Sequence, residues 1–579
     1  MLKTLMRSVR EYKKPAILTP VFIAGEVIIE CLIPFVTALL VNEIQNDCTM
    51  QTILRYGLIL IVMAGLSLLC GAMAGRFAAT AACGFAKNLR HDMFGAIQDY
   101  SFSNIDKFST SSLVTRMTTD VSNVQMAFMM IIRTAVRCPM MLVFALIMAI
   151  ITSPKMSIAF AVIIPVLAIG LALIMTKAAP MFRSVFKKYD KLNSSVQENV
   201  SGIRVVKAYV REDFEKKKLK GAADEVCMDF TKAEKILAFN TPLMQLCFNL
   251  LIFSICCFGS RLIINSAGSD LDVAGMAALQ TYGAQILMSL MMVSMIIVMI
   301  SMSAASANRI AEVLQEKSSI VNPDSPVNEV QDGSVIFDHV GFSYSANAEK
   351  EALRDINLFI ASGETVGIIG GTGSGKTSLI QLISRLYDVT EGSVKVGGVD
   401  VRDYDIEVLR NQVSVVLQKN LLFSGSIRDN LRWGNPDADD AEMERICRLA
   451  QADEFIRSFP DGYDTHIEQG GSNVSGGQKQ RLCIARALLK KPKILILDDS
   501  TSAVDTKTDA LIRRAFAQEI PDTTKIIIAQ RISSVEHADK IVVMDGGRIE
   551  SVGTHEELLK SSPIYREVYE SQNRGGDEQ

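Results

Sequence analysis

The chain has 579 residues, and its 60 lysines and arginines against 63 aspartates and glutamates give a formal net charge of −3. This balance excludes a nucleic-acid binder that works through bulk positive charge. Apolar residues make up 49% of the chain and charged residues 21%, which excludes a disordered or collagen-like protein and favours a membrane protein with a soluble part. The 11 cysteines include no Cys-x-x-Cys pair, so we expect buried thiols rather than a disulfide framework.

Six long apolar stretches predict a helical membrane domain, because about 20 residues are needed to cross a bilayer. Four of them contain no charged residue and two contain a few. In chain order they are Pro15–Val41, Tyr56–Gly75, Ala127–Thr152, Met156–Thr176, Ile236–Ser260 and Val273–Asn308. The basic N-terminal segment leads into the first stretch without a small-residue cleavage site, so we expect a retained membrane helix rather than a signal peptide.

The lysines and arginines outside these stretches are distributed unevenly. They gather in the N-terminal segment, in the long link between the second and third stretches, and in the long link between the fourth and fifth. The other three links are short and poor in lysine and arginine. The positive-inside rule therefore predicts a multi-pass protein of the cell membrane with both termini in the cytoplasm. The long links contain few prolines, so we expect the helices to continue well beyond the bilayer.

Four charged residues interrupt the apolar stretches. Glu26 and Glu30 in the first stretch are four residues apart and share a helix face, and Arg133 and Arg137 repeat that spacing in the third. Charge inside a membrane is costly and indicates a specific role. These residues either pair between helices, lie near the headgroups, or line a substrate cavity. The methionines of the last stretch are compatible with adaptable cavity walls or with lipid-facing packing.

We assign residues 1–315 to the membrane domain, 316–333 to a polar linker, and 334–579 to a soluble domain with a helical subdomain at about 420–485. The soluble domain alternates short apolar runs with helix-like segments. The runs are Val366–Ile369, Ser414–Leu417, Ile494–Leu497 and Lys525–Ala529. Short apolar runs bounded by turn signals are typical of buried parallel strands in an α/β fold.

A glycine-rich loop follows the first of these runs and fits the pattern G-x-x-x-x-G-K-[ST]. In such a loop, backbone N–H groups wrap around phosphates and the next helix, expected from Ser378, points its positive end at them. We expect Lys376 to bridge the β- and γ-phosphates of ATP and Thr377 to ligate Mg²⁺. The expected phosphate-binding residues are Gly370, Gly371, Thr372, Gly373, Ser374, Gly375, Lys376, Thr377 and Ser378.

Two further motifs complete a nucleotide site. The run Ile494–Leu497 ends in Asp498, which we expect to hold Mg²⁺ through water, and in Asp499, beside the attacking water. Ser475, Gly476, Gly477 and Gln478 precede a helix expected to begin near Lys479. A hydroxyl and backbone amides at a helix N-terminus form a second anion site.

With these motifs in order, the chain resembles the ATP-binding cassette (ABC) transporters of the exporter type over essentially its whole length. The resemblance implies an α-helical membrane domain of six helices followed by an α/β P-loop ATPase cassette. It also implies that two cassettes stack head to tail, so that each ATP lies between the phosphate loop of one and the Ser475–Gln478 signature of the other.

The resemblance extends to single residues. It assigns Tyr344 to adenine stacking, Gln418 to Mg²⁺ and to sensing the membrane domain, and Asp505 in Ser502–Asp505 to the dimer interface. Ile105–Phe108 and Ala208–Asp213 resemble the two intracellular loops that dock onto cassettes. The implied partners are a second half-transporter, the lipid bilayer and a small-molecule substrate, with no nucleic acid.

The chain departs from the family pattern at two catalytic positions. Asp499 stands where the family has a glutamate that serves as general base, and its carboxylate is one methylene, about 1.5 Å, shorter in reach. Gln530 stands where the family has a histidine, and it can donate a hydrogen bond but carries no charge. Both changes fall in the site built on Lys376, whereas the signature is intact.

These departures indicate the degenerate half of a heterodimeric exporter, which binds ATP and turns it over slowly while the partner's site hydrolyses. Two alternatives stay open. The chain could form a homodimeric exporter in which Asp499 is an adequate base, or a membrane-bound ATP-dependent sensor or regulator that closes on ATP without transport. The expected function is ATP-driven export of a hydrophobic or amphipathic, multidrug-like small molecule, and drug, lipid and peptide export all stay open.

Overall fold

The computed structural model describes residues 2–266, 270–345, 351–499 and 504–574. Its internal contacts divide it into two compact units. The membrane unit comprises Met1–Asp99 and Phe108–Glu316, and the cassette unit comprises Tyr100–Lys107 and Lys317–Gln579. The membrane unit is built of helices, and the cassette unit carries the β-strands.

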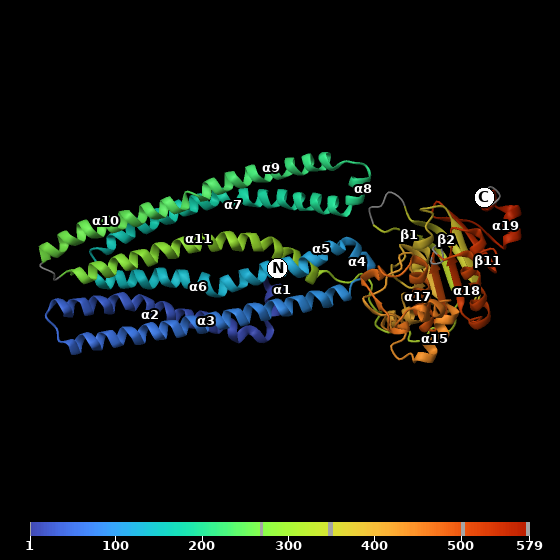
Figure 1. Cartoon of the computed structure of the whole chain (residues 1–579), viewed down its shortest axis with the longest axis horizontal. Coiled ribbons are helices and arrows are strands. Elements are labelled where there is room, and N and C mark those ends of the chain that lie inside the picture. Colours follow the sequence, from blue (N-terminus) through green and yellow to red (C-terminus); the bar gives the residue numbers. More distant parts are fainter. Residues whose placement is uncertain (1, 267–269, 346–350, 500–503, 575–579) are drawn as a thin grey trace. The chain divides into compact units, whose positions relative to one another are not determined.

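Long helices dominate the membrane unit (Figure 1). They are α2 (Lys13–Gln45), α3 (Met50–Gln98), α6 (Val121–Thr152), α7 (Ser157–Ser201), α9 (Glu212–Leu237), α10 (Asn240–Ser266) and α11 (Val273–Gln315). The shorter elements are α1 (Leu2–Met6), η1 (Arg7–Tyr12), α5 (Thr110–Thr115), η2 (Arg116–Asp120) and α8 (Ile203–Ala208). In the described part of the chain, six helical segments are long and apolar enough to cross a membrane, which confirms the predicted number of spans.

Several of these helices are far longer than a bilayer requires. Helix α3 has 49 residues and α7 has 45. At a rise of 1.5 Å per residue, α3 is about 74 Å long, whereas the hydrocarbon layer is only about 30 Å thick. The predicted extension of the helices beyond the membrane is therefore confirmed.

One expected helix is interrupted. The sequence predicts a continuous helix over Ile236–Ser260, but the structure ends α9 at Leu237 and starts α10 at Asn240. Pro242 accounts for this break, because proline has no N–H and its ring clashes with the carbonyl four residues earlier, that of Ala238.

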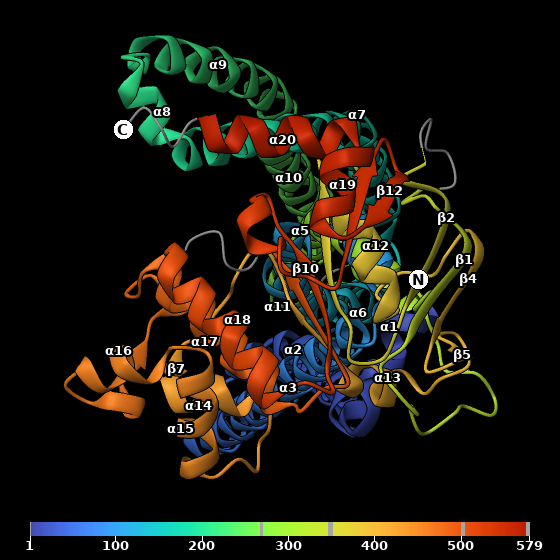
Figure 2. The ribbon, with the colours of Figure 1, turned by 90° about the vertical axis from the view of Figure 1, so that its right-hand side faces the viewer.

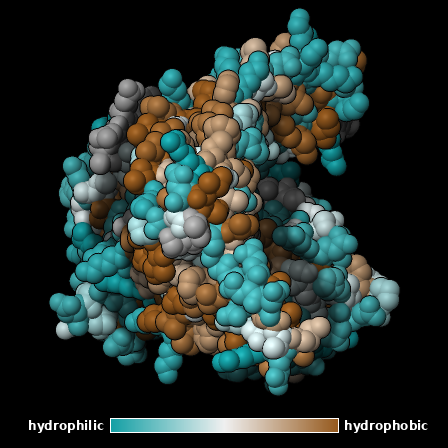
Figure 3. All heavy atoms as spheres, turned by 90° about the vertical axis from the view of Figure 1, so that its left-hand side faces the viewer, coloured by the Kyte–Doolittle hydropathy of each residue, from teal (hydrophilic) through white to brown (hydrophobic). Residues whose placement is uncertain are grey.

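The helices of the membrane unit pack as neighbouring pairs. Helix α2 runs along α3, α6 along α11, and α7 along α9 and α10 (Figure 1). Their buried side chains include Val27, Leu251 and Tyr282, whose hydroxyl donates to the carbonyl oxygen of Cys31 at 3.1 Å. Large apolar side chains also cover the outside; Leu68, for example, is 75% exposed. Exposed apolar side chains are expected on surfaces that face lipid. Figure 3, viewed from the end that lies on the left in Figure 1, shows apolar side chains among polar ones.

A six-stranded sheet forms the centre of the cassette unit. Its order is β12-β11-β3-β10-β9-β6. The strands are β3 (Thr365–Gly370), β6 (Val413–Val416), β9 (Ile494–Asp498), β10 (Thr524–Ile528), β11 (Lys540–Asp545) and β12 (Arg548–Gly553). Strands β11, β3, β10, β9 and β6 are parallel to their neighbours in this order, and only β12 is antiparallel. The four predicted apolar runs coincide with four of these parallel strands, except that Leu417 and Ala529 lie one residue beyond the ends of β6 and β10.

A second, antiparallel sheet was not anticipated from the sequence. Its order is β2-β1-β4-β5, with β1 (Val335–Phe342), β2 (Leu353–Ile360), β4 (Glu391–Val396) and β5 (Val399–Asp400). The register between β1 and β2 shifts twice, and His339 and Asp355 have positive φ angles. Such bulges interrupt the alternation of apolar and polar residues that marks a half-buried strand.

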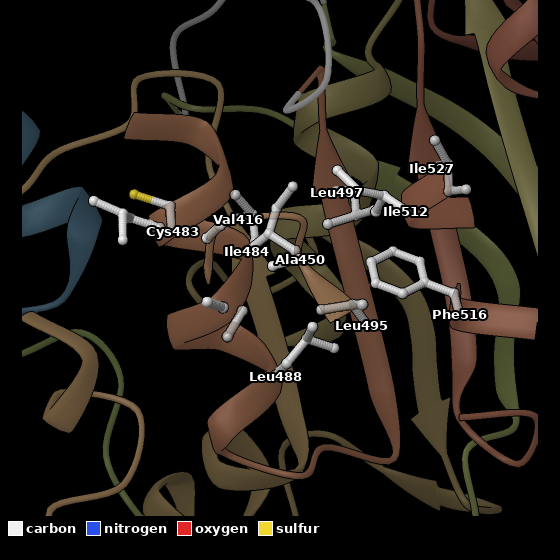
Figure 4. Close-up of a cluster of buried hydrophobic side chains, with 14 of the residues drawn as sticks. Val416, Ala450, Cys483, Ile484, Leu488, Leu495, Leu497, Ile512, Phe516 and Ile527 are labelled. Atoms are coloured by element: carbon white, nitrogen blue, oxygen red, sulfur yellow. The ribbon is translucent and has the colours of Figure 1, made fainter. Parts of the chain in front are cut away.

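The six-stranded sheet has an apolar core on each face. Because side chains alternate along a strand, Ile494 and Ile496 of β9 join the core shared with α12 (Lys376–Ile383) and α13 (Ile406–Gln412). Leu495 and Leu497 point to the other face. There they meet Ile484 and Leu488 of α17 (Gly476–Leu489) and Ile512 and Phe516 of α18 (Thr506–Glu519), as Figure 4 shows.

The remaining helices lie around this frame. Helices α14 (Ile427–Arg432), α15 (Asp440–Leu449) and α16 (Asp453–Ser458) gather near α17 and α18 (Figure 2). A two-stranded ribbon of β7 (Gly425–Ser426) and β8 (His466–Ile467) accompanies them, and α19 (His555–Ser561) and α20 (Pro563–Arg574) close the described chain. Helix α4 (Phe102–Lys107) belongs to the cassette unit by its contacts.

Candidate functional site: a nucleotide-binding loop and its switch residues

The glycine-rich loop joins the end of β3 to the start of α12. Gly373 and Gly375 have φ angles of +81° and +96°, a region that glycine adopts without steric cost. A Cβ atom on Gly370 would lie 2.2 Å from the carbonyl oxygen of Met544. The helix begins at Lys376 and not at the predicted Ser378, so the unpaired amides of its first turn belong to the motif itself.

Lys376 folds back over this loop. Its ammonium donates to the carbonyl oxygens of Gly370 and Gly371 at 2.8 Å each. Burial lowers the pKa of Lys376, against the opposing effect of the carboxylates of Asp498 and Asp499. A cation beside free helix N-terminal amides forms an anion-binding site of the kind that holds nucleotide phosphates.

Thr377 and Asp498 lie close enough to share one cation. The Thr377 hydroxyl is 3.3 and 3.1 Å from the two carboxylate oxygens of Asp498. Asp498 ends β9 and is only 3% exposed. Burial raises the pKa of Asp498, against the lowering effect of the Thr377 hydrogen bond. Oxygen ligands of this kind suit Mg²⁺, which usually takes one or two carboxylates and completes its shell with water and phosphate oxygens.

The structure brings together the three residues predicted to be catalytic. The Gln530 amide donates to the Asp499 carboxylate at 2.8 Å, and the Gln418 amide approaches the same oxygen at 3.4 Å. Asp499 has a φ angle of +48°, unusual for a residue with a side chain. Its backbone N–H donates to the carbonyl oxygen of Ile528 at 3.0 Å. Asp499 and Gln530 also line a cavity of about 220 Å³.

Sequence reasoning missed a residue that holds the segment carrying Gln530. The Gln572 side chain on α20 donates to the carbonyl oxygen of Gln530 at 2.8 Å and accepts from the N–H of Ile532 at 2.9 Å. Arg513 of α18 holds the same segment by donating to the carbonyl oxygen of Ser533 at 2.7 Å. No motif marks Gln572, which is 42 residues further along the chain.

Tyr344 lies beside the helix that starts the phosphate site. Its hydroxyl is 2.8 Å from that of Ser378 and donates to Gln381 at 3.2 Å. Its ring meets those of Phe342 and Tyr387 edge-on, and the side chain is 51% exposed. An aromatic ring that is supported on one side and open on the other suits stacking on a flat base.

Tyr387, which sequence reasoning also missed, connects this aromatic group to α4. Its hydroxyl donates to Asp106 at 2.5 Å, and its ring lies 6.0 Å from that of Phe102. Burial raises the pKa of Tyr387. Asp106 belongs to Ile105–Phe108, the first loop that the sequence associates with cassette docking. The second loop, Ala208–Asp213, joins α8 to α9 in the membrane unit.

The signature residues start α17. Ser475 is its N-cap, and the Ser475 and Gln478 side chains each bond the backbone N–H of the other. The helix therefore begins at Gly476, three residues before the predicted Lys479. Among the described residues, no hydrogen bond joins Ser475–Gln478 to the phosphate loop.

Asp505 caps α18 by accepting from the Thr508 N–H at 2.9 Å, which lowers the pKa of Asp505. It thus has a structural partner within its own chain. Ser502 and Ala503 lie outside the described residues.

The charged residues of the membrane unit form an ion-pair cluster. Arg137 of α6 pairs with Glu30 of α2 at 2.8 Å and with Glu26 at 3.5 Å. Helix–helix pairing, one of the alternatives for these residues, is therefore present. Arg133 and Arg137 also line a cavity of about 400 Å³.

Comparison with known proteins agrees with this architecture. Residues 16–291 match the family model of the ABC transporter transmembrane region, and residues 353–502 match that of the ABC transporter. The Bacillus subtilis "Uncharacterized ABC transporter ATP-binding protein YfiB" is 36% identical over 95% of this chain and 96% of its own. The Bacillus subtilis "Probable multidrug resistance ABC transporter ATP-binding/permease protein YheI" is 34% identical over 84% of this chain and 83% of its own.

A solved structure of a bacterial Atm1-family ABC exporter with ATP bound has the same fold. It superimposes with a TM-score of 0.83 over 97% of this chain and 98% of that one, at 23% sequence identity. The chain therefore belongs to the ABC transporter family, as an exporter with fused membrane domain and ATP-binding cassette that couples ATP hydrolysis to transport.

Proposed function

We propose that this chain is the degenerate half of a heterodimeric exporter. The site built on Lys376 binds ATP tightly and hydrolyses it slowly, and the partner's site carries out most of the hydrolysis. The observation that carries the proposal is the contact between Asp499 and Gln530, at 2.8 Å. The residue at the position of the general base is bonded to the residue at the position of the switch histidine, and both differ from the family pattern.

The chemistry of this contact disfavours rapid hydrolysis. A general base must accept a proton from water in the transition state, but one Asp499 oxygen already accepts from Gln530 and lies near Gln418. The aspartate is also about 1.5 Å shorter than the glutamate it replaces, and misplacement on this scale can cost about 10²-fold in rate. The neutral Gln530 cannot offset charge on the γ-phosphate.

ATP binding itself is well supported. In this proposal the Lys376 ammonium and the first-turn amides of α12 hold the phosphates, and the exposed face of Tyr344 stacks on adenine. Thr377 and Asp498, 3.1 Å apart, would hold Mg²⁺ together with Gln418. Bound Mg²⁺ supplies charge neutralisation between the phosphates. Ser475–Gln478 and Asp505 contact the ATP that is bound to the partner's phosphate loop.

The exported substrate is a hydrophobic or amphipathic small molecule. The methionines that line the cavity beside α6 and α11 provide adaptable apolar walls. The multidrug name of a relative that is 34% identical points the same way. The distribution of lysine and arginine supports a cell-membrane protein with both termini and the cassette in the cytoplasm.

Purification tests the proposal directly. The full chain is purified alone and together with a candidate partner half-transporter from the same organism, and ATPase activity is measured in lipid nanodiscs. We expect activity in the pair and little in the lone chain, with stimulation of the pair by substrate. A lone chain as active as the pair would favour the homodimeric exporter, and a pair that no transported compound stimulates would favour the sensor.

A further inference from the structure

The cavity in the membrane unit lies between α6 and α11 and holds about 400 Å³. Its apolar wall includes Met129, Met141, Met288 and Met292, and its polar groups include Arg133 and Gln285. This volume lies within the range of small-molecule sites, which combine apolar walls with a few polar groups that fix the ligand's orientation.

The two arginines of this cavity differ in their partners. Arg137 is neutralised by Glu30 at 2.8 Å and Glu26 at 3.5 Å. Among the described residues, no acidic side chain lies within ion-pair distance of Arg133. The charges of the four residues cancel as a group, but the carboxylates lie at Arg137, so positive charge is in excess at Arg133. Arg133 is exposed and lines the cavity, so its guanidinium is accessible to a ligand carboxylate.

A buried polar group in the same cavity is unsatisfied. The amide oxygen of Gln285 is buried and accepts no hydrogen bond from any described residue. A buried acceptor without a partner carries a desolvation penalty. A ligand with a hydroxyl or amide N–H would remove that penalty.

The positions of Arg133 and Gln285 along their helices indicate how deep each side chain lies in the apolar layer. Arg133 precedes the end of α6 at Thr152 by about 28 Å, and Gln285 follows the start of α11 at Val273 by about 18 Å, at 1.5 Å per residue. If these ends mark one face of an apolar layer about 30 Å thick, Arg133 lies near the opposite boundary and Gln285 lies deeper. With the proposed orientation, that boundary is the cytoplasmic one.

We propose that this cavity binds an amphipathic organic acid. Its carboxylate pairs with Arg133 near the cytoplasmic boundary, its apolar body lies along the methionines, and a donor further along the body reaches Gln285. The inference rests on the proposed export function and names its substrate class. The guanidinium holds a carboxylate in bidentate geometry, so charge determines which amphiphiles are accepted.

Binding of three matched probes to the full chain tests this proposal without nucleotide. The probes are 11-(dansylamino)undecanoic acid, its methyl ester, and the amine of the same length, titrated by fluorescence into chains in nanodiscs of uncharged phosphatidylcholine. We expect the acid to bind at least ~10-fold more tightly than the ester and the amine, the size of one charge-assisted pair.

Substitutions at Arg133 locate the effect. Arg133→Ala and Arg133→Gln should each remove the preference for the acid, and Arg133→Lys should retain part of it. Arg76→Ala is the matched control, because Arg76 is exposed and directly follows the apolar stretch of α3. It should leave the preference unchanged. Monodisperse elution and an unchanged melting temperature identify the variants that fold.

The inference fails if the wild-type chain binds the ester or the amine as tightly as the acid, or if folded Arg133 variants keep the preference. These results leave the proposed export standing, because that function is tested by the ATPase activity of the pair. Conversely, an acid preference that depends on Arg133 in a pair without substrate-stimulated ATPase would support the ligand site and overturn export.

Discussion

Restoring the two family residues at the Lys376 site should convert it into a hydrolytic site. The double substitution Asp499→Glu and Gln530→His replaces both members of the contact seen at 2.8 Å. The glutamate extends the carboxylate by about 1.5 Å toward the γ-phosphate. The histidine can donate to the phosphate and carry charge.

The size of the effect follows from this geometry. General-base catalysis contributes about 10²–10⁴-fold, and misplacing a catalytic group by about 1 Å can cost about 10²-fold. We therefore expect the double variant to hydrolyse about 10²-fold faster than the wild-type site, which corresponds to about 2.7 kcal/mol of activation free energy. Asp499→Glu alone should gain about 10-fold or less, because Gln530 still bonds the carboxylate.

The assay is phosphate release in a single turnover by the assembled pair, with the partner's own phosphate loop disabled so that only the Lys376 site counts. Asp499→Asn is the matched control for the base, since it keeps the size of the side chain but cannot accept the proton. Lys376→Ala controls for nucleotide binding. A wild-type rate within a factor of about three of the double variant would refute the reasoning, because the aspartate would then be an adequate base.

Three further predictions concern the supports of the two sites. Gln572→Ala should weaken ATP binding several-fold while leaving ADP binding unchanged, because Gln572 holds the main chain of Gln530. Equilibrium titration of both nucleotides measures this, with Ser571→Ala as the control variant. Equal losses of ATP and ADP affinity would indicate a general structural defect. Asp498→Asn should raise the melting temperature in Mg²⁺-free buffer, because burial raises the pKa of Asp498. The stabilising contribution of a raised carboxyl pKa is complete below the unfolded value of about 3.9 and is lost as pH rises through the folded one. The advantage of the asparagine should therefore grow as pH rises from about 4 to neutral, and an advantage that shrinks over this range would contradict the assignment. Arg137→Ala should lower the stability of the membrane unit by about 1–3 kcal/mol, because two carboxylates lose their partner; chemical denaturation measures this, and an unchanged midpoint would show that water already screens the pair.

Much of the fold could be predicted because the relevant signals are local. Crossing a bilayer requires a long apolar stretch, so the six spans follow from composition alone. The phosphate loop requires glycines at fixed spacing, as the angles of Gly373 and Gly375 show. The buried parallel strands are short apolar runs, which is why Ile494–Leu497 could be recognised before its neighbours in the sheet were known.

The rest depends on contacts between distant parts of the chain. The antiparallel sheet was missed because bulges near His339 and Asp355 interrupt its alternation. Nothing in the sequence distinguished pairing from cavity lining for Arg137, since the answer depends on how α2 and α6 pack. Gln572 lies in a helix without a motif, and its role is visible only through the main-chain bonds it makes.

The most direct test of the central claim is the identity of the nucleotide held at the Lys376 site while the pair is working. The assembled pair is allowed many turnovers with a photoactivatable, α-labelled ATP analogue, and the nucleotide cross-linked to this chain is then identified. We predict that it is ATP, while the partner carries ADP. Equal conversion to ADP on both chains would contradict the proposal that the Lys376 site retains ATP while the partner's site hydrolyses it.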